Sequence, residues 1–213
     1  MIKMAVYTAA FGTHDALREP AYVAPGVAYW CARDGLVESR TWGRIDFSPQ
    51  PDPVRAARRF KLLLHEHASR YDAYVWTDAA FSLEVDPLIF VPLLIRHDLL
   101  VMPHPFCGSL EAEATEISRR GLVARKVLDR QLAAYRARKY PGAPHSSTGL
   151  LVRRNDRRTA KFNAAWWAEL EAHCHTRDQM SFDFVAWRHG MSVGRLEGQY
   201  RENPYATWEA VAA

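Results

Sequence analysis

The chain has 213 residues, of which 48% are hydrophobic and 24% are charged, and its formal net charge is +4. This length suits a single domain with a sizeable core, and the composition is ordinary for a soluble globular protein. The positive excess is far too small for a nucleic-acid-binding tail, so we expect no nucleic-acid partner. The cysteines Cys31, Cys107 and Cys174 form no Cys-x-x-Cys pair, which argues against a zinc site or a disulfide framework.

The amino terminus reads as a strand rather than as a signal peptide. The longest apolar stretch, over residues 87–95, is too short to span a bilayer. We therefore expect a cytoplasmic protein with no transmembrane segment.

Strands and helices alternate along the chain. Short apolar runs predict strands at 3–9, 27–32, 71–78, 99–102 and 149–153, with a short extended piece at 81–85. Helix signals predict helices from Pro53 to about His67, over 87–95, over 110–139 with a break at Gly121, after Asp156 and after 176–179. The first helix is expected to bury Val54, Ala57, Leu64 and the stem of Lys61.

This alternation predicts one α/β domain over residues 1–213, with three α/β/α layers and a mostly parallel central sheet. Residues 199–213 are polar and aromatic without a clear period. We expect them to form a peripheral tail that either wraps the surface or frays.

Polar side chains follow the predicted strands at the point where each strand ends. Asp15 follows the first strand, Asp34 the second, Asp78 the third and His104 the fourth. Because the carboxyl ends of parallel strands share one edge of a sheet, these side chains are expected to face a common cleft. For Asp15, a turn or a helix cap is an equally good interpretation, and for Asp34, which precedes Gly35, a turn is the better one.

Asp78 is the strongest of these candidates. It ends a run of apolar residues, and the small Ala79 and Ala80 leave room for a ligand beside it. A buried carboxylate without a partner is costly, which favours a functional role. On the preceding helix, Arg58 and Lys61 lie one turn apart and suit either a diphosphate ligand or a solvated, ion-paired face.

Several common enzyme motifs are absent from the sequence. It contains no P-loop, no Gly-x-Gly-x-x-Gly, no Gly-x-Ser-x-Gly and no His-Glu-x-x-His. These absences count against a P-loop NTPase, a dinucleotide-dependent oxidoreductase, an α/β-hydrolase and a zincin.

Several segments, in the same order, resemble a known family. They are residues 7–15, 52–61, 76–78, 162–167 and 177–182, so the resemblance spans roughly residues 5–190. The family is the glycosyltransferase-like family first catalogued as a domain of unknown function, which has plant mucilage-related and bacterial members. The resemblance implies a GT-A nucleotide-sugar fold. It also implies a transferase that takes a UDP- or GDP-linked sugar to a carbohydrate or other hydroxyl acceptor, with inversion and retention both open.

The resemblance implies roles for the matched residues. The expected nucleoside contacts are Thr8, Ala9, Phe11, Asp15 and Asp34, and the expected phosphate contacts are Arg58 and Lys61. Asp78 is expected to contact a metal or the donor sugar. Asp178 and Gln179 are expected to hold the sugar and the acceptor, with Asp178 either orienting the donor or acting as a base.

The family also implies a divalent metal, manganese or magnesium, held by an Asp-x-Asp motif. Here Thr77 and Ala80 leave Asp78 as the single carboxylate of that motif. One oxygen ligand is too few for a dedicated octahedral site, and Arg58 with Lys61 would then partly replace the metal.

Three other functions compete with the transferase. The lone carboxylate at Asp78 also suits a nucleotide-sugar-binding protein without turnover. A metal-dependent hydrolase would use Asp78, His104 and Asp178 around an ion. A nucleic-acid binder, suggested only by the basic charge, is the weakest alternative.

Overall fold

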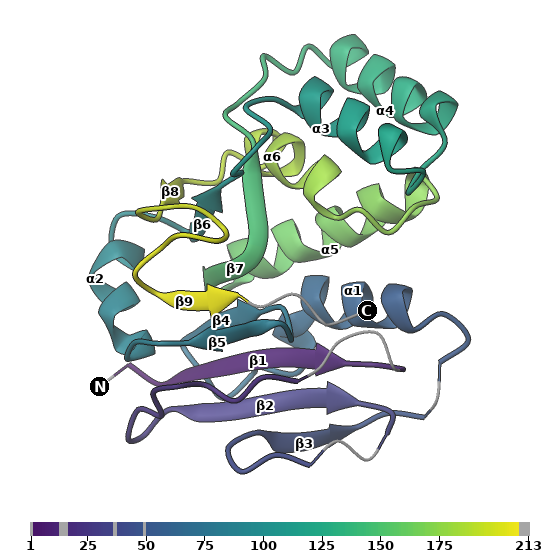
Figure 1. The fold of residues 1–213 in the computed structure, drawn as a ribbon. Coiled ribbons are helices and arrows are strands. Elements are labelled where there is room, and N and C mark those ends of the chain that lie inside the picture. Colours follow the sequence, from purple (N-terminus) through teal and green to yellow (C-terminus); the bar gives the residue numbers. More distant parts are fainter. Residues whose placement is uncertain (1, 13–16, 36–37, 49, 209–213) are drawn as a thin grey trace.

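The structure is a computed structural model that describes residues 2–12, 17–35, 38–48 and 50–208. A seven-stranded sheet runs through the middle of this part, in the order β3-β2-β1-β4-β7-β6-β8 (Figure 1). Its strands are β1 (Met4–Ala10), β2 (Ala28–Arg33), β3 (Gly43–Asp46), β4 (Ala73–Thr77), β6 (Leu99–Pro103), β7 (Ser146–Arg154) and β8 (Val193–Arg195). Within this sheet only β7 runs antiparallel to its neighbours, β4 and β6. The predicted mostly parallel sheet is confirmed.

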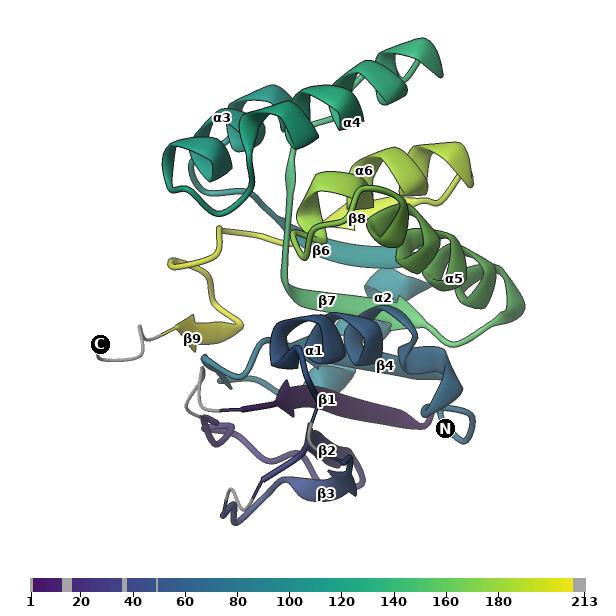
Figure 2. The same cartoon turned by 90° about the vertical axis from the view of Figure 1, so that its right-hand side faces the viewer.

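The sheet separates two hydrophobic cores. Every residue of β1 is buried, with Tyr7 in one core and Val6 in the other, as expected for a central strand covered on both faces. One face is covered by α1 (Pro53–Leu62), α5 (Arg157–Ala172) and α6 (Gln179–Arg188), which lie together in Figure 2. The helix pair α3 (Leu110–Arg119) and α4 (Arg125–Ala137) packs on α6 through a small third core.

The opposite face departs from the predicted layer of helices. Its helical cover is limited to the short η2 (Pro87–Phe90) and α2 (Val91–Leu94). A second sheet of two antiparallel strands, β5 (Phe81–Leu83) and β9 (Ala206–Trp208), completes the cover. Residues 199–208 therefore lie along the surface of the fold, and residues 206–208 pair with β5.

Local signals explain most of the helix boundaries. The Asp52 carboxylate caps α1 by accepting a hydrogen bond from the Arg55 amide at 2.9 Å, and Asp156 caps α5 in the same way. α1 ends at Leu62, earlier than predicted, and a single 3-10 turn, η1 (Leu64–Glu66), follows it. Val54 is 37% exposed, contrary to prediction, because Phe60 and Leu62 fill the core instead.

The sequence analysis missed three strands, β3, β8 and β9. All three are short, and each obtains its hydrogen-bond partners from one neighbouring strand. Gly121 breaks the helical region between α3 and α4 as predicted, with a φ of 68°. In the described part of the chain, no helix is long and apolar enough to cross a membrane.

Candidate functional site

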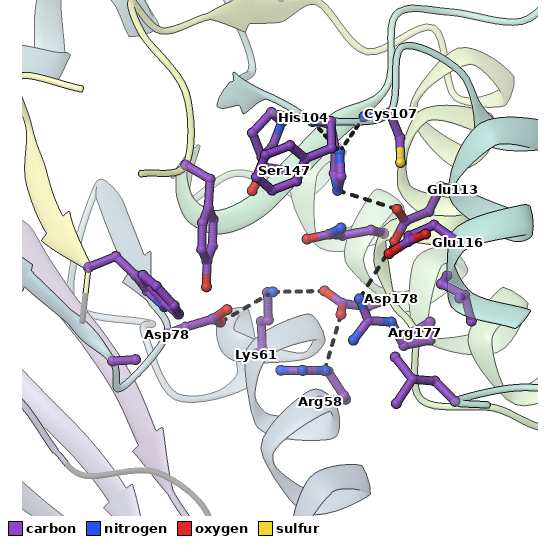
Figure 3. Close-up of a pocket in the computed structure, with 18 of the residues that line it drawn as sticks. Arg58, Lys61, Asp78, His104, Cys107, Glu113, Glu116, Ser147, Arg177 and Asp178 are labelled. Carbon is purple, nitrogen blue, oxygen red and sulfur yellow. Dashed lines mark hydrogen bonds and ion pairs between the residues drawn. The ribbon is translucent and has the colours of Figure 1, made fainter. Parts of the chain in front are cut away.

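A cavity of about 390 Å³ lies where the parallel strands β1, β4 and β6 end. Much of its polar lining falls into three groups, and residues of two of them are labelled in Figure 3. The first wall is formed by Arg58 and Lys61 of α1, Asp78 after β4, and Asp178 before α6. The second wall consists of His104, Cys107, Glu113, Glu116, Arg120 and Arg177. The C-terminal segment contributes Tyr200, Arg201 and Trp208.

An ion-paired cluster forms the first wall (Figure 3). The Lys61 Nζ atom lies 2.7 Å from Asp178 Oδ2 and 3.6 Å from Asp78 Oδ1, and Arg58 Nε lies 3.1 Å from Asp178 Oδ1. The Thr148 hydroxyl accepts from Lys61 at 3.1 Å and donates to Asp178 at 2.9 Å. The side chains of Lys61 and Asp178 are 1% and 5% exposed, so each charge depends on the other for compensation.

The sheet register places Asp78 at this wall. Tyr7 of β1 pairs with Trp76 of β4, so the chain leaves β4 level with the end of β1. The Asp78 amide donates to the Gly149 carbonyl at 2.8 Å, and the Trp76 indole donates to Asp78 Oδ1 at 2.8 Å. The Asp78 side chain is 28% exposed, and within the described residues no donor contacts its other oxygen, Oδ2. Asp78 can therefore hydrogen-bond a ligand.

Asp178 is held as a carboxylate. Burial alone would raise the pKa of Asp178, but the ion pairs with Lys61 and Arg58 and the Thr148 hydrogen bond hold it well below its usual range. Its backbone has helical angles and its side chain makes no capping bond to α6, so Asp178 does not serve as a helix cap. Gln179 accepts from the Thr148 amide at 3.4 Å, which ties the start of α6 to β7. Because Lys61, Arg58 and Thr148 already contact this carboxylate, it is better suited to positioning a ligand than to accepting a proton.

The oxygen atoms near Asp78 do not fit a magnesium or manganese site. Such ions need an octahedron of oxygen ligands at about 2.0–2.1 Å. Asp78 Oδ1 already accepts from Trp76 and lies beside the Lys61 ammonium, while both oxygens of Asp178 contact cations. A divalent ion placed here would be repelled by Lys61.

The second wall contains a group with metal-ligand chemistry. The ligand atoms of His104, Cys107 and Glu113 lie within 4.8 Å of one another. However, His104 Nδ1 accepts from the amides of Phe106 and Cys107 at 3.3 and 3.0 Å, so its proton is on Nε2, which lies 3.4 Å from Glu113. Burial raises the pKa of the Cys107 thiol to about 12. We therefore describe the group as a polar hub around Glu113, since a metal on Nε2 would require the proton to move to Nδ1.

The structure brings together most of the predicted site residues. The predicted residues that line the cavity are Ala9, Arg58, Lys61, Asp78, His104, Asp178 and Gln179. Glu113, in the first turn of α3, was not among the predicted site residues. Its burial at the hub was missed, because the sequence spacing does not show that α3 turns this side chain toward the cavity.

Three of the predicted nucleoside contacts do not line the cavity. Thr8 is fully buried within β1, and Phe11 packs edge-on against Phe47 with ring centroids 5.4 Å apart. The Asp34 carboxylate accepts from the Gly12 amide at 3.0 Å and joins the chain after β1 to the chain after β2. In the described structure Asp34 therefore connects two loops and does not line the cavity. Asp15 lies outside the described residues.

The C-terminal segment is the part of the site that the sequence analysis did not find. Trp208 pairs with Phe81 in the small sheet, and the Tyr200 ring packs edge-on against Phe81 at 4.9 Å. A Cβ on Gly149 would lie 2.8 Å from Phe81 and 2.9 Å from Tyr200, so the bare glycine permits this packing. The aromatic residues within 199–208 are the sequence feature that could have indicated this contribution to the site.

Comparison with known proteins agrees with the site geometry. The family model described as TOD1/MUCI70, glycosyltransferase-like domain, matches residues 44–196, more than two thirds of the chain. The matched segment includes the first wall of the cavity and ends before the C-terminal contribution. No curated protein matches the chain significantly. The family match confirms the resemblance seen in the sequence, and the chain belongs to the TOD1/MUCI70 glycosyltransferase-like domain family.

Proposed function

We propose that this protein is a GT-A-type glycosyltransferase that moves a sugar from a nucleotide diphosphate to a hydroxyl group of a carbohydrate or other acceptor. The observation that carries the proposal is the cluster of Lys61, Asp178, Arg58 and Asp78 at the carboxyl edge of the parallel sheet, inside the family match. UDP- and GDP-sugars are the donor classes to test first.

In this proposal the protein positions the reactants and stabilises charge. Asp178 and Gln179 hold hydroxyl groups of the sugar, and Lys61 keeps the Asp178 carboxylate in place. Asp78, through its partly exposed Oδ2, contacts the donor or takes the proton of the acceptor hydroxyl. The low pKa of Asp178, its ion pairs with Lys61 and Arg58, and the hydrogen bond from Thr148 support a positioning role over that of a base.

We further propose that transfer does not need a divalent metal. The Lys61 ammonium lies between the two carboxylates of the first wall, where a metal-dependent enzyme would place a cation. The metal-dependent hydrolase receives less support, because His104 Nε2 lies 3.4 Å from Glu113 and both oxygens of Asp178 already contact cations.

The test is a donor panel. Purified protein is incubated with UDP- and GDP-linked sugars, with and without a mixture of oligosaccharide acceptors, and release of the nucleoside diphosphate is measured. We expect release with one donor class from the wild type and none from Asp178→Asn, while Asp129→Asn, which alters an exposed ion pair with Arg125, retains activity. Tight donor binding without release would favour the binding protein, and a protein that neither binds nor turns over any donor would refute both functions.

A further inference from the structure

We infer that Arg201, on the C-terminal segment, supplies the positive charge that receives the diphosphate of the donor. The inference rests on the proposed function and moves the main phosphate contact away from α1. It also lies beyond the matched family segment, which ends at residue 196.

The first wall has little positive charge left for a diphosphate. Lys61 contacts both Asp178 and Asp78, and Arg58 contacts Asp178, so two cations face two carboxylates. A strongly anionic diphosphate entering this wall would meet Asp78 and Asp178 as well as the two cations. A further cation is therefore needed for favourable binding.

The arginines of the second wall are paired as well. Arg120 Nε lies 2.6 Å from Glu116, and Arg177 lies 3.6 Å from Glu113. Arg201 differs from them, because no carboxylate of the described residues contacts its guanidinium group. Among the described cavity arginines and lysine, it is the one that no acidic side chain of the described residues contacts.

Aromatic rings hold the Arg201 guanidinium group in place. Its central carbon lies 4.6 Å from the ring centroid of Trp208 and 5.7 Å from that of Phe106. Such contacts use the faces of the planar group and leave its N–H edges for a ligand. A guanidinium group restrained in this way loses less freedom on binding, and its fork matches the oxygens of a phosphate.

A chain of contacts links Arg201 to Asp78. Asp78 is followed after two alanines by Phe81, which pairs with Trp208 across the small sheet. Trp208 in turn lies against the Arg201 guanidinium group, and both line the cavity. Arg201 is thus fixed to the turn that carries Asp78, which places its charge at the cavity where we propose that the donor binds.

The test compares binding of a nucleoside diphosphate with binding of its nucleoside. Calorimetry with UDP and uridine, and with GDP and guanosine, is carried out on the wild type, Arg201→Gln and Arg201→Lys. Loss of a hydrogen bond to a charged group corresponds to about a tenfold to hundredfold change in affinity. We expect Arg201→Gln to weaken diphosphate binding by that factor and to leave nucleoside binding unchanged, with Arg201→Lys in between.

Arg125→Gln is the matched control, because Arg125 is an exposed, ion-paired arginine that does not belong to the cavity lining. We expect it to change diphosphate affinity less than twofold, and thermal melting checks that every variant is folded. Equal affinities of the wild type and Arg201→Gln for the diphosphate would overturn the inference and leave the transferase proposal standing. Inorganic pyrophosphate separates the remaining cases. Arg201-dependent binding of pyrophosphate without binding of any nucleotide would support the inference and refute the proposed function, whereas a wild type that binds none of these compounds refutes both.

Discussion

Replacement of Asp178 by asparagine tests whether the ion-paired cluster holds the site together. The substitution keeps the size of the side chain and an oxygen acceptor for Thr148, but it removes the charge that faces Lys61 at 2.7 Å and Arg58 at 3.1 Å. Lys61 is then left buried with Asp78, at 3.6 Å, as its remaining carboxylate partner. Removal of one partner of a buried pair costs about 3–5 kcal/mol, and the residual contact with Asp78 puts the expected loss near the lower end, about 3 kcal/mol.

Urea unfolding at pH 7, followed by tryptophan fluorescence, measures this loss in the free energy of unfolding. The matched control is Asp129→Asn, because Asp129 pairs with Arg125 at 2.8 Å on the exposed surface. Exposed pairs of this kind contribute about 0.3–0.5 kcal/mol, so the control variant should unfold almost as the wild type does. A loss below about 1 kcal/mol for Asp178→Asn would refute the claim that the carboxylate compensates the buried lysine.

The same experiment has a pH signature. The pKa of Asp178 is depressed in the folded protein, so its contribution to stability is present in full above the unfolded pKa of about 3.9 and is lost as the pH falls toward the depressed value. The stability gap between wild type and Asp178→Asn should therefore stay constant from pH 7 to about pH 5 and narrow below about pH 4. A gap that widens on acidification would contradict the proposed ion pairing.

Three further predictions concern the rest of the site. Asp78→Asn should abolish nucleoside diphosphate release while lowering stability by at most about 1 kcal/mol, because the side chain is partly exposed and its backbone bond to Gly149 remains; activity that survives with an unchanged melting temperature would assign Asp78 no role in the reaction. Treatment with EDTA should change the transfer rate by less than about twofold relative to the untreated protein. A strict requirement for added manganese would show that Lys61 does not replace a metal. Gly149→Ala should cost about 1–3 kcal/mol, because the new methyl group meets Phe81 and Tyr200, and it should also reduce donor binding. Gly108→Ala, where a Cβ has open space, is its control, and equal melting temperatures of the two variants would show that the close approach at Gly149 is not required.

Features controlled by local interactions could be predicted from the sequence. The Asp52–Pro53 pair marks the start of α1, and the break at Gly121 follows from the φ > 0 that a glycine adopts at low cost. The apolar runs of β1 and β4 indicate central strands because both faces of such strands must be buried. The short strands β3, β8 and β9 carry no comparable signal, since the neighbouring strand determines whether they pair.

The individual residues of the site were also recognisable, but their relations to one another were not. The sequence analysis predicted that Lys61 contacts a phosphate, that Asp78 contacts a metal or a sugar, and that Asp178 contacts a sugar or an acceptor. It predicted no ion pair among the three. The tertiary structure joins the three into one ion-paired cluster and adds Arg201 from a segment that the sequence pattern assigned to the periphery. A charge that is already paired attracts a ligand less strongly. Lys61 is paired with Asp178, which lies more than a hundred residues away in the chain, so the sequence alone does not reveal this pairing. Residue types and strand ends thus determine which side chains are candidates, whereas their pairing across the sheet decides which charge is left for the substrate.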